Sequence, residues 1–185
     1  NYALSQTAPA AEIVAVVDAD YVVESDFLAD LTGHFADERV AFVQTPQDYR
    51  DHSDRGRYGR ALYLAYLYFF EVSMASRNEH NGIIYAGTMG LIRRSALDAL
   101  GGWDEWCVTE DAEISLRLLS AGYESVYVPK TYGRGIMPLD YSGLRKQRFR
   151  WAFGGMQILR KHAGLTRNPC TAGRRAWRKR LAYIN

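Results

Sequence analysis

The sequence predicts an α/β domain in which a mostly parallel sheet is flanked by helices. Short apolar runs rich in β-branched residues alternate along the chain with segments whose apolar residues recur at helical spacing. The 185 residues, 48% of them hydrophobic and 24% charged, are enough for one soluble domain with a core of its own. No internal repeat or low-complexity segment indicates another architecture.

The first predicted strand covers residues 13–17 (IVAVV), a continuous apolar run typical of a buried parallel strand. Residues 40–45 (VAFVQT) form the second, which Pro46 ends. Ligands bind such sheets at the carboxyl ends of strands, where residues 18–20 are expected to lie. The helix predicted between the two strands has an apolar stripe made of Phe27, Leu28, Leu31 and Phe35.

The later elements continue this alternation. A polar loop at 47–57 precedes a long helix at 58–75, which is apolar on most faces and therefore expected to be buried. Thr109 is a good N-cap for a helix that Gly122 ends. The other predicted elements are strand pieces within 83–92, a short helix at 95–100, a strand at 125–128, and a helix at about 142–162 that Gly154 and Gly155 can disturb.

The net charge of +2 hides an uneven distribution. Residues 141–185 contain no Asp or Glu but 12 of the 23 Lys and Arg residues, so the first 140 residues hold 11 basic and 21 acidic ones. The acidic part suits cations, and the basic part suits phosphates or an anionic surface. Few aromatic residues are interleaved with the basic ones, which argues against a nucleic-acid-binding module.

Cysteine usage and hydropathy exclude further classes. Cys107 and Cys170 lie far apart, so they indicate neither a disulfide framework nor a zinc site and favour a reducing compartment. The most apolar run, residues 61–70, is far shorter than the roughly 20 residues of a membrane-spanning helix.

Two acidic motifs carry candidate chemistry. Asp18 and Asp20, one residue apart just after a strand, can converge on Mg²⁺ or Mn²⁺, although such a pair is also common in solvated turns. Glu110 and Asp111 follow Thr109 in the first turn of a helix, where the helix dipole stabilises anions. Asp111 is therefore a candidate general base, while dipole complementation alone is the alternative.

The third motif is the stretch 147–151 (QRFRW). On a helix Gln147, Arg150 and Trp151 share one face because of their spacing. A guanidinium beside an amide and an indole suits a phosphate next to a sugar. A basic surface helix anchored by a Trp is the alternative interpretation.

The three motifs DAD, TED and QRFRW, in this order, resemble the family-2 glycosyltransferases of the cellulose synthase, chitin synthase and hyaluronan synthase type. Residues 1–4 (NYAL), 42–47 (FVQTPQ) and 85–94 (YAGTMGLIRR) are similar to other segments of that family. The resemblance extends to about His162. It implies a GT-A fold, a divalent metal (Mg²⁺ or Mn²⁺) and inverting transfer of a sugar from a nucleotide-diphosphate sugar, a UDP-sugar in the first instance, to a hydroxyl acceptor.

The resemblance also implies roles for individual residues. Asp18 and Asp20 are expected to hold the metal and the donor diphosphate, Arg150 to steady that diphosphate, and Asp111 to act as the general base. The acceptor is expected to contact the residues Gly87, Thr88, Glu110, Gln147 and Trp151.

One departure concerns the beginning of the domain. Family members start with a strand and a base-binding Asp, which are expected before Asn1, so the chain is expected to lack the N-terminal part of the fold. Residues 1–163 are then a partial GT-A catalytic domain. Residues 164–185 are expected to be a basic interfacial segment leading toward a membrane, because basic residues surround Trp177 before an apolar start at 181–184. This places the enzyme on the cytoplasmic face of the cell membrane, within a larger integral membrane protein.

Several alternatives stay open at this point. The acceptor is expected to be a growing polysaccharide, but a single transfer to a lipid-linked or small acceptor fits the same motifs. Where many cellulose synthases have Cys before Gly-Thr, this chain has Ala86, which leaves the transferred sugar open. A glycoside hydrolase also uses two carboxylates, but it needs neither the DAD pair nor an arginine-rich helix.

Overall fold

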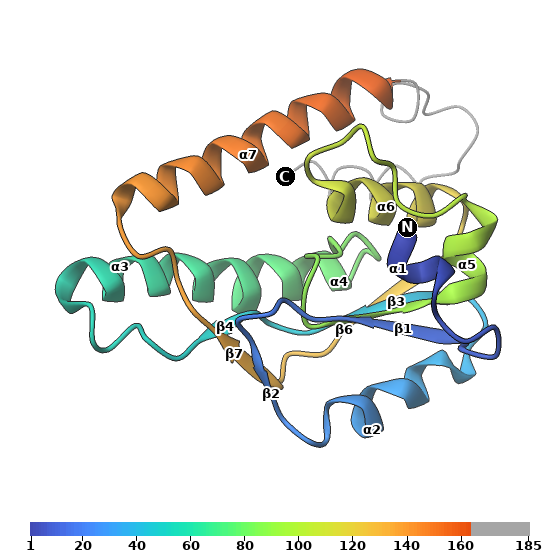
Figure 1. The fold of residues 1–185 in the computed structure, drawn as a ribbon, viewed down its shortest axis with the longest axis horizontal. Helices are drawn as coiled ribbons and strands as arrows, with labels where there is room; N and C mark the ends of the chain where they lie inside the picture. Colours follow the sequence, from blue (N-terminus) through green and yellow to red (C-terminus); the bar gives the residue numbers. More distant parts are fainter. Residues whose placement is uncertain (164–185) are drawn as a thin grey trace.

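The computed structural model describes residues 1–163, which form a four-stranded sheet between helical layers and a small three-stranded sheet beside it (Figure 1). The large sheet has the order β1 (Ile13–Val16), β5 (Gly90–Arg93), β3 (Val40–Gln44) and β6 (Glu124–Tyr127). The small sheet has the order β2 (Val22–Val23), β7 (Gly133–Gly135) and β4 (Asp48–Tyr49).

The direction of β5 corrects the prediction of a mostly parallel sheet. β3 pairs in parallel with β6, but β5 is antiparallel to both β1 and β3, so the sheet is mixed. β1, β3 and β6 run in the same direction. β5, which lies between β1 and β3, runs in the opposite direction. Local hydrophobic patterns indicate a strand but not its direction, because the direction depends on the end of the sheet at which the chain enters.

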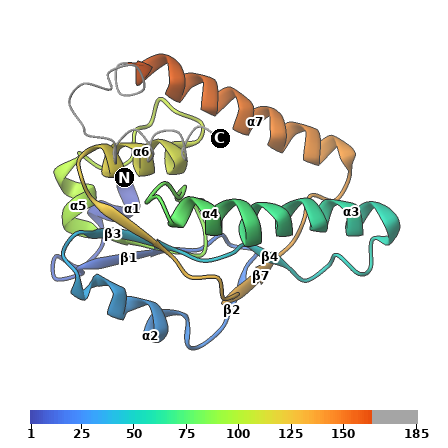
Figure 2. The ribbon, with the colours of Figure 1, turned by 180° about the vertical axis from the view of Figure 1, so that it is seen from behind.

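Helices cover both faces of the large sheet (Figures 1 and 2). On one face lies α2 (Phe27–Thr32), continued by a 3₁₀ turn. On the other lie α6 and the helices around it, with α7 as an outer layer over α3 and α6. The helices beyond α2 are α1 (Tyr2–Ser5), α3 (Gly56–Leu67), a π-helical segment (Tyr68–Met74), α4 (Ala75–Asn78), α5 (Arg94–Ala99), α6 (Glu110–Ser120) and α7 (Tyr141–Lys161).

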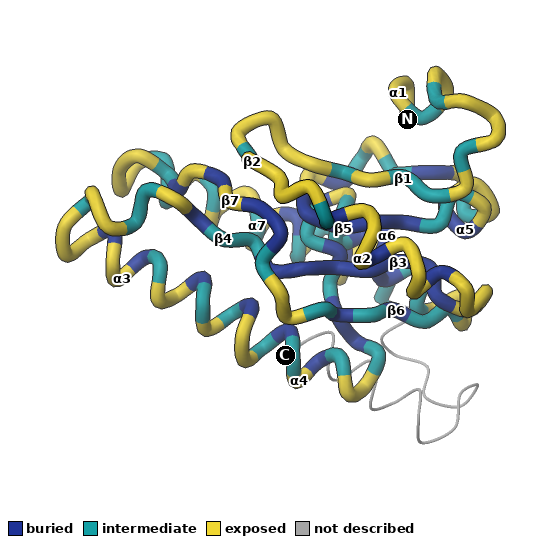
Figure 3. Tube along the Cα trace, turned by 90° about the horizontal axis from the view of Figure 1, so that it is seen from below, coloured by how far each residue is buried: buried dark blue, intermediate teal, exposed yellow. Residues whose placement is uncertain are grey.

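The central strands provide the core, and Figure 3 shows β3 and β5 as buried. Phe42 of β3 packs with Tyr85 in a cluster beneath α6 and the π-helical segment, and the two rings lie 5.6 Å apart. Val43 contacts the opposite face, in a cluster that contains Phe27 and Leu31 of α2. Because successive side chains of a strand point to opposite faces, β3 packs against the helices on both sides of the sheet.

A long helix covers the predicted range 58–75, but one side of it is exposed, whereas the sequence predicts a helix that is buried on most faces. Gly56–Asn78 is one continuous helical stretch through its π-helical middle. Leu64, Tyr68 and Val72 are 63%, 66% and 51% exposed, and they form an outward stripe. The buried side carries Leu62, Tyr66, Phe70 and Met74.

Gly154 and Gly155 do not disturb α7, which is continuous from Tyr141 to Lys161. A Cβ at Gly154 would overlap the side chain of Thr109, so glycine permits a close approach between α7 and the start of α6. Thr109 is the N-cap residue as predicted, but its side chain makes no capping hydrogen bond. Its hydroxyl lies 3.6 Å from the Cys107 sulfur instead.

The predicted basic segment at 164–185 lies outside the described residues. Within residues 1–163, no helix combines the length and apolar character that crossing a bilayer requires.

The packing of α2 yields a matched stability test. Leu31 is fully buried against the sheet, whereas Leu28, three residues earlier, is 52% exposed. Leu31→Ala is expected to lower the free energy of unfolding by about 2–5 kcal/mol through lost burial and a cavity. Leu28→Ala is expected to lower it by at most about 1 kcal/mol. Urea unfolding followed by circular dichroism measures both, and equal losses would contradict the packing described for α2.

Candidate active site

The DAD motif lies at the carboxyl end of β1, and two hydrogen bonds anchor it, one through the Asp18 backbone and one through the Asp20 side chain. The Asp18 backbone N–H donates to the Thr88 hydroxyl at 2.9 Å. The backbone N–H of Ile136 donates to the Asp20 carboxylate at 3.2 Å. Both aspartates are exposed, so the loop is anchored while carboxylate oxygens remain accessible.

The antiparallel direction of β5 brings a second loop to this end of the sheet. Gly90, the first residue of β5, pairs with Val16 at the end of β1 and with Gln44 at the end of β3. The residues just before β5, Gly87 and Thr88, therefore lie beside the DAD motif. A parallel strand would have carried them to the opposite end.

The side chains of Gln44 and Gln47 hold the loop that contains Gly87 through hydrogen bonds to its backbone. Gln44 is fully buried, and its side-chain nitrogen donates to the Thr88 carbonyl at 2.8 Å. Its side-chain oxygen accepts from the Ala86 backbone N–H at 2.8 Å. Gln47 donates to the Ala86 carbonyl, also at 2.8 Å. These contacts fix both ends of the Gly87 turn, because Gln44 has a partner on each side of Gly87. The Gln44 nitrogen also donates to the Thr45 carbonyl at 2.9 Å.

Gly87 brings the loop against Asp111 of α6. Its φ of +77° lies in the left-handed region, and a Cβ would be 2.6 Å from the Asp111 carboxylate oxygen. Both the backbone conformation and the space therefore require glycine here. The contact places the TED motif next to the loop that supports Asp18.

Asp111 has the electrostatic character of a base that works near neutral pH. Burial raises its pKa to about 6, from a usual value of 3.8. The Ala112 backbone N–H, which donates to the carboxylate at 2.7 Å, opposes the rise, Glu110 adds to it and Arg150 opposes it. A carboxyl group with such a pKa both accepts and releases a proton readily.

Arg150 of α7 links the remaining motif to the first two. Partial desolvation raises the pKa of Asp18, Asp20 raises it further, and the charge of Arg150 lowers it. Arg150 acts in the same direction on Asp111. The guanidinium is thus within electrostatic reach of both carboxylates, which brings DAD, TED and QRFRW to one place.

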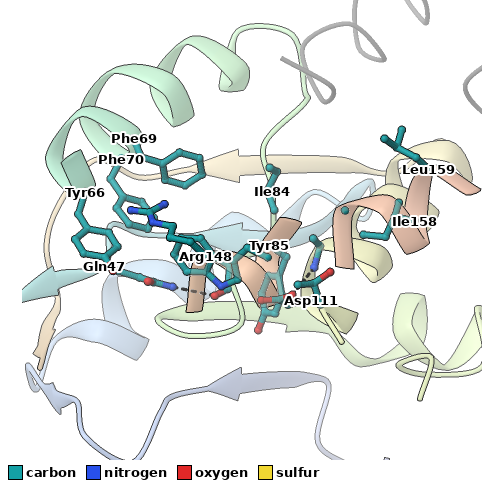
Figure 4. A pocket seen from close by; sticks show the side chains of 15 residues that line it. Gln47, Tyr66, Phe69, Phe70, Ile84, Tyr85, Asp111, Arg148, Ile158 and Leu159 are labelled. Atoms are coloured by element: carbon teal, nitrogen blue, oxygen red, sulfur yellow. Dashed lines mark hydrogen bonds between the residues drawn. The ribbon is translucent and has the colours of Figure 1, made fainter. Parts of the chain in front are cut away.

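A pocket of about 370 Å³ opens beside Asp111, between α7 and the helix of Tyr66 (Figure 4). Tyr66, Phe69 and Phe70 line one side, and Arg148 and Trp151 of α7 line another. The π-helical segment places the consecutive residues Phe69 and Phe70 in the same wall. The pocket lining is mainly apolar, with five aromatic side chains, and it includes the titratable carboxyl of Asp111.

The residues of the stretch 147–151 make different contacts. Gln147 accepts a hydrogen bond of 2.6 Å from the Tyr66 hydroxyl, so it ties α7 to α3. The Arg148 guanidinium lies over the rings of Trp151, at 4.7 Å, and Tyr66, at 5.2 Å. Trp151 faces the pocket, whereas neither Gln147 nor Arg150 is among the residues that line it.

Direct contacts join two pairs of the predicted site residues, Asp18 with Thr88 and Gly87 with Asp111. Gln147, which was expected to contact the acceptor, bonds to Tyr66 and is not among the residues that line the pocket. Thr88 is buried, and its side chain supports the Asp18 backbone. Glu110 is exposed and acts on Asp18 and Asp111 through its charge. Sequence reasoning assigned no role to the residues Gln44, Gln47, Tyr66, Phe69, Phe70 and Arg148. A glutamine inside an otherwise apolar strand was the one local signal that pointed to Gln44.

The DAD motif fits a divalent metal that substrate phosphate helps to bind. Residues 1–163 contain no group of three or more His, Cys, Asp or Glu side chains arranged for a metal ion. Mg²⁺ sites of this kind use one or two carboxylates and complete the shell with water and phosphate oxygens. The mutual repulsion of Asp18 and Asp20, visible in the raised pKa of Asp18, is what a cation would relieve.

Curated relatives resemble nearly the whole chain. It is 30% identical over 179 residues to a cellulose synthase catalytic subunit (UDP-forming) of Xanthomonas axonopodis pv. citri (strain 306), covering 94% of this chain and 24% of the relative. It is 28% identical over 170 residues to a probable glucomannan 4-beta-mannosyltransferase 4 of Oryza sativa subsp. japonica, covering 91% and 30%. The chain therefore spans less than a third of the length of these relatives.

A solved structure confirms the predicted GT-A-like glycosyltransferase fold. The mannosyltransferase PcManGT from Pyrobaculum calidifontis, in complex with GDP-Man and Mn²⁺, matches with a TM-score of 0.69 and 21% identity. The match covers 100% of this chain and 47% of the mannosyltransferase. Residues 13–184 match the family described as Glycosyl transferase family group 2. Since this match covers most of the sequence, the chain belongs to glycosyl transferase family group 2.

Proposed function

We propose that this domain transfers a sugar from a nucleotide-diphosphate sugar to a hydroxyl acceptor, with inversion at the anomeric carbon. The observation that carries the proposal is that one loop contacts both the DAD motif, through Thr88, and Asp111, which lines a pocket with aromatic walls. The charge of Arg150 acts on both Asp18 and Asp111. A carboxylate pair, a guanidinium and a carboxyl of raised pKa are the groups that such a transfer needs.

The donor diphosphate lies between the DAD motif and α7 in this proposal. A Mg²⁺ or Mn²⁺ ion held by Asp18 and Asp20 would neutralise the charge that grows on the departing diphosphate. Arg150 binds phosphate oxygens and contributes a permanent positive charge. A UDP-forming relative and a fold neighbour in complex with GDP-Man and Mn²⁺ support this donor class, and we favour a UDP-sugar.

The acceptor occupies the pocket in this proposal. Asp111 takes the proton from the acceptor hydroxyl while that oxygen attacks the anomeric carbon on the face opposite the diphosphate. A single displacement of this kind inverts the carbon. Trp151 offers a flat face to an acceptor sugar, and a growing polysaccharide is the acceptor class that the cellulose synthase relatives support.

A donor panel tests the proposal. The intact parent protein is incubated with UDP- and GDP-sugars and with saccharide or lipid acceptors, and products are identified by mass spectrometry. Transfer from a UDP-sugar to a saccharide is expected. Transfer only to lipid or small acceptors would favour the non-processive alternative. Cleavage of simple glycosides without any nucleotide sugar would contradict a transferase.

The exposed side chains on the outward face of α7 support the predicted location of the enzyme at a membrane surface. Phe149, Phe153 and Met156 are 72%, 49% and 64% exposed on this face. α7 contains Arg145, Lys146, Arg148, Arg150, Arg160 and Lys161 but no acidic residue. An exposed apolar stripe on a basic helix fits the interface of an anionic bilayer. We infer that α7 lies against the cytoplasmic face of the cell membrane within a larger membrane protein.

Metal dependence follows from the DAD motif. Transfer is expected to stop in excess EDTA and to return with Mg²⁺ or Mn²⁺, because the two carboxylates alone repel the diphosphate. The Asp18→Asn and Asp20→Asn variants are expected to lose most of the activity, and Asp98→Asn, at an exposed position of α5, serves as the control. Undiminished turnover in EDTA would contradict a metal-dependent donor site.

The pH profile follows from the pKa of Asp111. The group must be ionised to accept a proton, and its folded pKa of about 6 lies above the usual 3.8. Transfer is therefore expected to fall as the pH drops below about 6, by about tenfold per pH unit well below it. Asp111→Asn is expected to lower kcat by about 10² to 10⁴ and to remove this limb. If the activity of Asp111→Asn falls at low pH as that of the wild type does, the titrating group is not Asp111.

Membrane contact is tested with vesicles. The chain is expected to sediment with vesicles of phosphatidylglycerol and phosphatidylcholine more than with phosphatidylcholine alone. The double variant Phe149→Ser and Met156→Ser is expected to bind several-fold less. Leu28→Ser is the control, because Leu28 is similarly exposed but belongs to α2 on the other face of the sheet. Equal binding by all three proteins would contradict a membrane-facing α7.

A further inference from the structure

The side chain of Gln157 holds the loop that leads into α6. The Val108 backbone N–H donates to its oxygen at 3.1 Å, and its nitrogen donates to the Trp106 carbonyl at 3.0 Å. One amide thus binds two backbone groups on either side of Cys107. Val108 precedes Asp111 by only three residues, so these bonds lie just ahead of the candidate base.

Two neighbours of Gln157 on α7 pack against the same loop. Gly154 lies so close to Thr109 that a Cβ would overlap it, and the Cys107 thiol donates weakly to the Gly154 carbonyl at 4.0 Å. Ile158 packs with Cys107 in a small buried cluster. Residues 154–158 therefore form a continuous docking surface for residues 106–109, in which Gln157 makes the directional contacts.

The end of α7 is anchored to α6 as well. His162 lies 2.7 Å from the carboxylate of Glu113, which is fully buried and also pairs with Arg117 at 2.8 Å. This contact limits how far α7 can slide along α6. From this anchored helix, Gln157 contributes side-chain hydrogen bonds to the backbone of the loop at 106–108.

Arg150 and Gln157 are seven residues apart, two turns of one uninterrupted helix. A rigid helix fixes their separation at about 10 Å along its axis. The same helix therefore carries the charge that acts on Asp18 and Asp111 and the amide that holds the approach to Asp111. Building on the function proposed above, we propose that Gln157 is a positioning residue that sets Asp111 in register with Arg150 and the donor diphosphate.

The expected effect is on placement more than on folding. Val108 is exposed, and water can replace part of the lost hydrogen bonding when Gln157 is substituted. A small misplacement of a reacting group, by contrast, can reduce turnover strongly. Gln157 does not line the pocket, so a change there is not expected to alter acceptor contacts directly.

The test compares Gln157→Leu, Gln157→Glu and Gln6→Leu in the intact chain. Leu removes both hydrogen bonds, and Glu keeps the acceptor for the Val108 N–H. Gln6 is an exposed control that bonds only to the neighbouring Ser5 among the described contacts of its side chain. Gln157→Leu is expected to lower kcat by about 10- to 100-fold with the donor KM within about twofold, whereas Gln157→Glu retains more activity. Gln6→Leu is expected to match the wild type.

A second readout separates positioning from general damage to the fold. The charges that act on Asp111 come from Glu110 on α6 and Arg150 on α7, and Asp111 in turn acts on Tyr85 below it. None of these groups is changed in Gln157→Leu. A loosened loop admits water to Asp111, so the midpoint of the acidic limb is expected to fall below that of the wild type. Wild-type kcat and an unmoved limb in Gln157→Leu would overturn the proposal.

A measurement without turnover distinguishes this proposal from the proposed function. The Asp111 carboxyl is titrated by ¹³C NMR in the wild type and in Gln157→Leu, with circular dichroism as the check on folding. A lower midpoint in Gln157→Leu supports the positioning role even if no nucleotide sugar is consumed by the wild type. An identical midpoint overturns it, whether or not the wild type is a transferase. If Gln157→Leu does not fold, the same titration is made with Gln157→Ala, for which a lower midpoint is expected and an identical midpoint overturns the role.

Discussion

The buried amide of Gln44 fixes the loop on which the rest of the site depends. Its oxygen and nitrogen bind the backbone of Ala86 and Thr88, on either side of Gly87. An unpaired buried amide is unfavourable, so the strand and the loop hold each other in one arrangement. From this loop Thr88 supports Asp18, and Gly87 contacts Asp111. Two motifs that lie about ninety residues apart in the chain are thus joined through three consecutive loop residues.

The site concentrates negative charge around few positive groups. Burial is the largest cause of the raised pKa values of Asp18 and Asp111, and it brings that of Asp111 to about 6. Asp20 and Glu110 raise the pKa of Asp18 further, Glu110 raises that of Asp111, and the charge of Arg150 lowers both. Such an arrangement favours a bound cation near Asp18 and Asp20 and leaves Asp111, which is more buried, as a proton acceptor.

Helix α7 connects the site with its surroundings because its faces differ. The inner face carries Trp151 toward the pocket and Gly154 toward α6. The opposite face carries Phe149 and Met156 in solvent. Because a helix moves as a rigid body, any surface that binds the outer face also fixes the inner face. The contacts of the inner face in turn affect how Arg150 and Asp111, for which we propose phosphate binding and proton transfer, lie relative to each other.

Local patterns were enough to predict the α/β class, the positions of β1, β3 and β6, the start of α6 and the three motifs. Hydrophobic periodicity, helix caps and short motifs can be read from neighbouring residues alone. It also indicated the chemistry of Asp18, Asp111 and Arg150 through a family resemblance. The tertiary structure was needed to show that β5 runs antiparallel, that Thr88 is buried and bonds to Asp18, and that Leu64 faces solvent. It was also needed to show that Gln44 and Gln157 bond to the backbone of the loops at 86–88 and 106–108, respectively. Strand direction, burial and hydrogen-bond partners depend on segments far apart in the chain, and no local pattern encodes them.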